Sequence, residues 1–113
     1  MKKSNYIAGQ WVEGTGSIKN INPSDTSEII DEYTSCTDEQ FEQSIRSAAS
    51  AQREWETVGI EKKSQVLIKI GDELIQKSKQ IGELLSREEG KPLNEGIGAV
   101  SYTHLTLPTN GTV

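Results

Sequence analysis

The clearest pattern of apolar and polar positions lies between Ile60 and Gly96. Apolar residues recur there at helical spacing, with charged residues on the other side, and this stripe comprises Val66, Leu67, Ile70, Leu74 and Ile75. The stripe is interrupted at Lys77-Ser78-Lys79, and a second one begins at Ile81. Gly90 is suited to the left-handed conformation that ends a helix, and Pro92 lies just beyond it. The pattern predicts a long amphipathic helix, a short break, a second helix and then a stop.

An earlier helix is predicted to begin after Thr37. Thr37 and Gln40 have the spacing of a capping box, in which each side chain accepts a hydrogen bond from the other residue's backbone N–H. One helical face then comprises Phe41, Ile45, Ala48, Ala49, Gln52 and Trp55. The alanines make this face narrow, so another helix or a sheet can approach it closely. Val58-Gly59 separates this helix from the next one.

Short β-prone runs precede the helices. Asn5–Ala8 and Trp11–Glu13 are predicted to pair as a hairpin whose two-residue turn is Gly9-Gln10. Gly14–Ser17 is predicted to be a loop. A second antiparallel pair is expected from residues 18–21 and 28–33.

The second pair is expected to turn at Asn22-Pro23-Ser24-Asp25, because these residue types favour turns. Two hairpins alone are only marginally stable, so they must lie against other structure. The predicted order is four strands and then three helices, with no parallel strand–helix–strand unit.

Composition narrows the classes of function. The 113 residues allow one small domain or part of a larger one, and the apolar fraction of 33% is low for a self-sufficient globule. The net charge of −5, with acids and bases interleaved, argues against nucleic acid or an anionic membrane as a partner. No segment has the length of a membrane span or the apolar core of a signal peptide, so a cytoplasmic location is expected.

The motifs that suggest chemistry are weak. Gly14-Thr15-Gly16 and Gly96-Ile97-Gly98 each begin like a dinucleotide-binding fingerprint, but Lys19 or Ser101 replaces the third glycine. Turn and helix-packing roles are the simpler interpretation of these glycines. The single cysteine, Cys36, has no base nearby in sequence and is expected to be a small, semi-buried side chain. One cysteine and one histidine also exclude a thiolate or histidine-rich metal site within the chain.

Several longer motifs occur in a defined order along the chain. They are Tyr6–Trp11, Ile21–Asp25, the capped helix ending in Trp55, and Arg87–Leu93. In order and spacing this set resembles the start of the NAD(P)-dependent aldehyde dehydrogenase family. Asn20–Asp25 and Glu88–Gly98 look most like the α-ketoglutarate semialdehyde dehydrogenase branch. The resemblance implies an α/β fold in which residues 5–100 form the N-terminal β-hairpins and helices of a Rossmann-like cofactor domain that is incomplete here.

The resemblance also implies a reaction. In this family a cysteine thiolate attacks the aldehyde, a backbone amide and an asparagine stabilise the oxyanion, hydride passes to the nicotinamide, and a glutamate activates water. The full-length parent would use NAD or NADP, oxidise an aldehyde and form a homo-oligomer. None of these catalytic or cofactor-binding positions matches a residue of this chain, and Cys36 does not match the nucleophile's motif. The segment would pack on the cofactor domain, bind no cofactor tightly by itself and be inactive alone.

One site within the chain follows from the resemblance. Some family members bind a structural monovalent cation, and the matching ligands here would be Asn20 and Ile21, through backbone carbonyls, and Glu88. Oxygen ligands suit a hard cation. A cation would also give Glu88 a partner at a helix C-terminus, where the helix dipole disfavours an acid. The alternative is that Glu88 points to water or pairs with Lys91.

The last residues, 101–113, depart from the family pattern, which would continue as a helix. They contain no Asp, Glu, Lys or Arg and are rich in threonine. Tyr102, Leu105 and Leu107 alternate and could form a short strand, which Pro108 would end. The run resembles translated adapter sequence, so residues 101–113 are predicted to be an unrelated, artefactual tail.

The alternative to a truncated dehydrogenase is a small helical binding or scaffold protein that acts through a partner.

Overall fold

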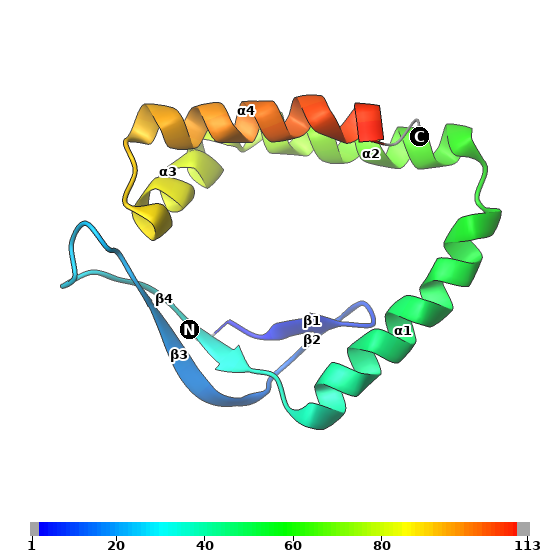
Figure 1. The fold of residues 1–113 in the computed structure, drawn as a ribbon, viewed down its shortest axis with the longest axis horizontal. Coiled ribbons are helices and arrows are strands. Elements are labelled where there is room, and N and C mark those ends of the chain that lie inside the picture. The colour runs from blue at the N-terminus through cyan, green and yellow to red at the C-terminus, as the bar shows by residue number, and fades with distance from the viewer. Residues whose placement is uncertain (1–2, 111–113) are drawn as a thin grey trace. The chain divides into compact units, whose positions relative to one another are not determined.

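The computed structural model describes the backbone of residues 3–110 and the side chains of residues 3–103. Within this part of the chain, four short strands are followed by four helices (Figure 1). The chain divides between Thr57 and Val58 into two compact units, the first with all the strands and one helix, the second with three helices. Within residues 3–110, no helix combines the length and the apolar character needed to cross a membrane.

The first hairpin pairs β1, Asn5–Ile7, with β2, Gln10–Val12, as predicted. Its turn is Ala8-Gly9, so the predicted turn Gly9-Gln10 is wrong by one residue. Both turn residues are left-handed, with φ of 51° at Ala8 and 80° at Gly9. Two successive left-handed residues are characteristic of the type I′ turn, whose twist matches that of the strands it joins. Alanine rarely adopts this conformation, so the residue types do not predict a turn at Ala8.

The second hairpin pairs β3, Thr15–Ile21, with β4, Ile29–Ser35. Strand β3 begins before its predicted start, because residues 15–17, which were expected to be loop, belong to it, and β4 continues past its predicted end to Ser35. The pairing register shifts between Thr15 and Ile18, and Gly16 there has a φ of 63°. A bulge with a left-handed glycine explains why this stretch looks like a loop in the sequence and still pairs.

The turn predicted at Asn22–Asp25 is confirmed. The Asn22 side-chain oxygen accepts a hydrogen bond of 2.9 Å from the Ser24 N–H, and its amide nitrogen donates to the Glu28 carboxylate at 2.7 Å. The buried Asn22 side chain therefore holds both ends of the connection between the strands.

Helix α1, Asp38–Thr57, begins at the predicted capping box. The Gln40 N–H donates to the Thr37 hydroxyl oxygen, and the Thr37 N–H donates to the Gln40 side-chain oxygen, both at 3.1 Å. The Gln40 side-chain nitrogen also donates to the Glu13 carbonyl at 2.8 Å, which ties the helix start to the end of the first hairpin. The large residues of the predicted packing face stay exposed, Phe41 by 60%. The first hairpin lies beside Ala48 of the predicted face and beside Ser44, Ser47 and Ala51, which are outside that face.

The second unit begins with α2, Ile60–Gln76, and α3, Ser78–Glu89, which are separated at Lys77. Both helices and the break between them confirm the prediction. Gly90 ends α3 with a φ of 69°, and its N–H donates to the Ser86 carbonyl at 2.8 Å. This is the left-handed helix end expected of a glycine at this position.

A fourth helix, α4, spans Leu93–Asn110. The predicted short strand over Tyr102–Leu107 is therefore wrong, because these residues are helical. The Pro92 carbonyl accepts from the Gly96 N–H at 3.1 Å, so Pro92 both follows one helix and starts the next. Proline lacks the N–H that a helix start leaves without a partner, and it suits this position.

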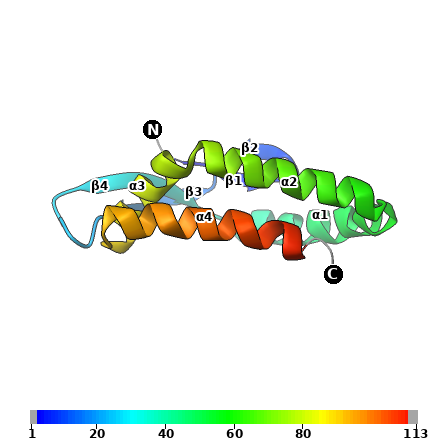
Figure 2. The same cartoon turned by 90° about the horizontal axis from the view of Figure 1, so that it is seen from above.

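Helix α4 packs along both α2 and α3 (Figures 1 and 2). Gly82 of α3 and Gly96 of α4 are buried where these two helices cross. A Cβ atom on Gly82 would lie only 2.7 Å from the Cα of Ile97, and one on Gly96 only 2.5 Å from the Gly82 carbonyl oxygen. The helix-packing role predicted for Gly96 is therefore confirmed. In this unit Val100, exposed by 4%, is the buried apolar side chain among the described residues.

Candidate functional site

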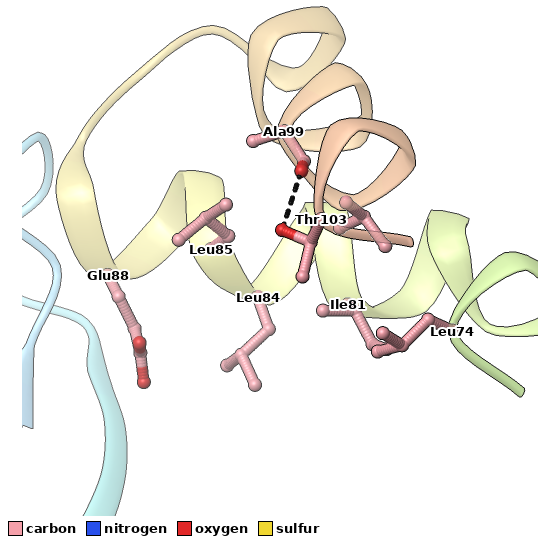
Figure 3. Close-up of a pocket in the computed structure, with 8 residues that line it drawn as sticks. Leu74, Ile81, Leu84, Leu85, Glu88, Ala99 and Thr103 are labelled. Atoms are coloured by element: carbon pink, nitrogen blue, oxygen red, sulfur yellow. Dashed lines mark hydrogen bonds between the residues drawn. The ribbon is translucent and has the colours of Figure 1, made fainter. Parts of the chain in front are cut away.

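An apolar groove of about 230 Å³ lies where α3 and α4 meet the end of α2 (Figure 3). It is lined by Leu74, Ile81, Leu84, Leu85, Glu88, Ala99, Val100 and Thr103. Leu84 and Glu88 are one helical turn apart on α3 and point to the same side (Figure 3). The Thr103 hydroxyl donates to the Ala99 carbonyl at 3.0 Å, so it is already used within its own helix. The groove thus presents an almost wholly apolar wall with one half-buried carboxylate.

A second groove, of about 450 Å³, adjoins the first, and Leu74 and Ile81 line both. Its other lining residues are Val66, Ile70, Lys69, Glu73 and Lys77. The two grooves form one surface, which we call the apolar track, whose large apolar residues are Val66, Ile70, Leu74, Ile81 and Leu84. Three charged side chains also line this track: Lys69 and Glu73 of α2, and Lys77 between α2 and α3.

The described side chains do not assemble the groups needed for a reaction at this surface. No group of three or more His, Cys, Asp or Glu side chains within the described residues could hold a metal ion. Cys36 lies in the first unit, between β4 and α1, and it is exposed, so the predicted semi-buried thiol is wrong. The polar side chains that line the apolar track are Glu88 and Thr103 in the first groove and Lys69, Glu73 and Lys77 in the second.

The polar turn of the first unit holds one carboxylate with a perturbed pKa. The Asp25 carboxylate accepts hydrogen bonds from the Ser27 hydroxyl at 2.6 Å and from the Ser27 N–H at 3.1 Å. These two hydrogen bonds, the hydroxyl first, hold the pKa of Asp25 below its ordinary value. Asp25 is fully exposed and stabilises a turn, which is a structural role.

The predicted cation ligands belong to different units. Asn20 and Ile21 end β3 in the first unit, and Glu88 lies in the last turn of α3 in the second. The cation site stays a prediction. In the alternative, Glu88 pairs with Lys91, but the ion pair observed for Lys91 joins its ammonium to the Glu89 carboxylate at 2.8 Å.

The first glycine of each pair, Gly14 and Gly96, is packed against backbone atoms. The Gly14 N–H donates to the Thr34 hydroxyl oxygen at 2.9 Å, and a Cβ on Gly14 would overlap the Ser35 carbonyl oxygen. Gly96 lies in the helix crossing described above. Packing therefore accounts for Gly14 and Gly96, and the absence of a cofactor-binding residue stays a prediction.

The sequence pattern did not reveal the α4 side of the groove. Ala99 and Val100 line this side, and both come after Gly90 and Pro92, which were expected to end the helical region. Leu93, Ile97 and Val100 do recur at helical spacing, and this was the signal that could have revealed α4.

The arrangement of strands and helices is the N-terminal part of a known α/β fold. The NADP-dependent glyceraldehyde-3-phosphate dehydrogenase of Bacillus halodurans, solved in complex with NADP, is similar with a TM-score of 0.93 at 24% sequence identity. The similarity covers 99% of this chain and 24% of that one. It places this chain at the start of a Rossmann-like fold, as the family resemblance implies.

The sequence model of the aldehyde dehydrogenase family matches residues 11–109, and the chain belongs to this family. Members of the family are oxidoreductases that use NAD or NADP. The match continues past Val100, and the foreign origin of residues 101–113 stays a prediction.

Two curated relatives illustrate the extent of the similarity. Aldehyde dehydrogenase family 7 member A1 of Pisum sativum is 36% identical over 95 residues, which are 84% of this chain and 18% of that protein. Malonate-semialdehyde dehydrogenase 1 of Geobacillus kaustophilus is 31% identical over 98 residues, which are 85% of this chain and 20% of that protein. The chain thus spans about a fifth of the length of the curated relatives it matches.

Proposed function

We propose that this chain is the N-terminal part of an enzyme that oxidises an aldehyde to a carboxylate with NAD or NADP. The observation that carries the proposal is the family match over residues 11–109, together with a fold that agrees with the same part of the family's structures. In the overall reaction, the aldehyde and water give the carboxylate, and a hydride equivalent passes from the aldehyde carbon to the nicotinamide with release of protons.

We further propose a semialdehyde as substrate, α-ketoglutarate semialdehyde in particular. The motifs Asn20–Asp25 and Glu88–Gly98 support this choice, as does the similarity to a malonate-semialdehyde dehydrogenase. A semialdehyde carries a carboxylate at its far end, so the substrate-binding part of the enzyme would need a cationic or N–H-rich pocket for it. The parent would be a cytoplasmic homo-oligomer.

This chain would contribute structure to the enzyme and no reacting group. By the family resemblance, the nucleophile, the water-activating glutamate and the cofactor loop match no residue of this chain. Cys36 does not match the nucleophile's motif and lies exposed between β4 and α1. By itself the 113-residue chain is therefore expected to bind no nicotinamide cofactor tightly and to oxidise no aldehyde.

The test is to read the source DNA past the Val100 codon and to assay the product of the longest open frame. NAD(P)H formation would be followed at 340 nm with α-ketoglutarate semialdehyde, malonate semialdehyde and propanal. We expect faster turnover of a semialdehyde than of propanal. Equal or preferred turnover of propanal would contradict the substrate proposal alone. A confirmed stop after Val113 in independent clones, or an intact protein that reduces neither cofactor, would favour the binding or scaffold protein instead.

A further inference from the structure

One edge of β4 faces away from β3, and the start of the chain lies along it. Within residues 3–110, β3 and β4 form a sheet of two strands, so a third strand could pair with this outer edge. Lys3 occupies the edge by forming a parallel bridge with Tyr33. The Lys3 N–H donates to the Glu32 carbonyl at 2.7 Å, and the Thr34 N–H donates to the Lys3 carbonyl at 3.0 Å. Lys3 therefore acts as a strand of a single residue.

A side chain of β4 satisfies a further backbone group on the same edge. The Glu32 N–H points to the same side of the strand as the Glu32 carbonyl, and it donates to the Asp31 carboxylate at 3.3 Å. The same carboxylate lies 3.6 Å from the Lys3 ammonium. The Lys3 side chain is 57% exposed, so this ion pair contributes little by itself. Another strand would have to displace Lys3 to pair with Glu32 and Thr34.

The first hairpin holds Lys3 at this edge. Thr34, which is exposed by 6%, binds Lys3 through its N–H, and its hydroxyl oxygen accepts from the Gly14 N–H at 2.9 Å. Lys3 precedes β1 and Gly14 follows β2, so both ends of the hairpin are attached to one residue of β4. Because β1 and β2 pair between these two points, Lys3 is held by more than its own two hydrogen bonds.

We infer that Lys3 is an edge clamp, which closes the outer edge of β4 and keeps this edge from pairing with β4 of a second copy of the chain. An open sheet edge presents backbone groups to which a strand of another molecule can add, and short edge strands and lysines commonly block it. A second copy is the expected partner because antiparallel pairing of two identical edges is a closed, two-fold symmetric contact. The clamp does not depend on the proposed aldehyde oxidation.

Two substitutions of Lys3 separate its backbone role from its charge. Proline has no N–H, so Lys3→Pro removes the hydrogen bond to the Glu32 carbonyl together with the ammonium. Lys3→Ala removes only the ammonium and is the matched control. The first measurement is hydrogen–deuterium exchange of the Thr34 N–H by NMR. The internal reference is the Asn22 N–H, which donates to the Glu28 carbonyl at 3.1 Å in the turn of the second hairpin.

We expect Lys3→Pro to raise the exchange rate of the Thr34 N–H by about tenfold, the order expected when one net hydrogen bond is lost. The Asn22 N–H should exchange at an unchanged rate in both variants, and Lys3→Ala should leave the Thr34 rate unchanged as well. An unchanged Thr34 rate in the Lys3→Pro chain would overturn the clamp. An equal rise at Asn22 would do so too, because Lys3 would then support the whole hairpin and not its edge.

The second measurement tests the effect of the clamp on association. Sedimentation velocity would compare the three chains at about 1 M sodium chloride, where a screening length of about 3 Å weakens the repulsion between the acidic side chains of two β4 edges. Lys3→Pro should self-associate at a clearly lower protein concentration than the unchanged chain, and Lys3→Ala at the same concentration as the unchanged chain. The other surfaces are identical in the three chains and contribute equally. Equal self-association of the Lys3→Pro and Lys3→Ala chains would overturn the protective role.

Discussion

Replacing Gly82 by alanine should separate α3 from α4, because the added methyl group has no space. Its Cβ would lie 2.6 Å from Cγ1, 2.7 Å from Cα and 2.8 Å from the nitrogen of Ile97. Carbon atoms in contact normally lie about 3.5–4.0 Å apart. The side chain of Ile97 could rotate away, but its backbone atoms belong to α4, so the whole helix would have to shift.

The size of the effect follows from two opposing terms. An extra carbon forced into a packed contact typically costs about 1–3 kcal/mol. Alanine in a helix interior is favoured over glycine by about 1 kcal/mol. The net expectation for Gly82→Ala is a loss of up to about 2 kcal/mol in the free energy of unfolding. Gly98→Ala is the matched control, since its Cβ would meet no atom within 4 Å and only the helix-propensity gain applies.

The assay is urea unfolding followed by far-ultraviolet circular dichroism, at protein concentrations where light scattering shows a monomer. Gly82→Ala should lower the midpoint and Gly98→Ala should raise it, by up to about 1 kcal/mol in unfolding free energy. A Gly82→Ala chain as stable as the unchanged one would refute the close helix crossing. Destabilisation by Gly98→Ala would refute the assignment of the crossing to Gly82 and Gly96.

Three further predictions concern the first unit. Ala8→Gly should raise the free energy of unfolding of the first unit by up to about 1 kcal/mol, because Ala8 is held at a left-handed φ of 51° that glycine adopts without strain. An unchanged or lower urea midpoint would contradict this expectation. Thr37→Ala should lower the free energy of unfolding by about 1 kcal/mol. The double variant with Gln40→Ala should lose less than the sum of the two single variants, because the capping hydrogen bonds are reciprocal. Strict additivity of the two losses would be inconsistent with the capping box. Because the folded-state pKa of Asp25 is lowered, its contribution to stability is present above the unfolded-state pKa and is lost as the pH falls through the folded-state value. Ser27→Ala should raise that pKa toward the ordinary value in an NMR titration, and an unchanged pKa would exclude Ser27 as the cause.

The elements that could be predicted from the sequence are those whose determinants lie within a few residues of one another. The capping box of Thr37 and Gln40 marks the start of α1, and the left-handed Gly90 marks the end of α3. The apolar periodicity between them identifies α2 and α3. Membership of the aldehyde dehydrogenase family could also be predicted from the sequence, because several short motifs occur in the family's order and spacing.

The elements that could not be predicted depend on residues distant in sequence or on an unusual local conformation. Ala8 adopts a left-handed turn because the twist of two paired strands requires it, against the preference of alanine. Helix α4 continues through residues whose alternation, at Tyr102, Leu105 and Leu107, suggested a strand, and it packs on both α2 and α3.

The candidate site shows the same division. The sequence by itself determined that α2 and α3 would each carry an apolar stripe, because that stripe is a property of helical periodicity. Only the tertiary structure decided which part of each stripe is buried and which part forms the apolar track. The reason is that α4 approaches α3 closely at Gly82 and Gly96, and in this arrangement Leu85 is half-buried while Leu84 stays exposed.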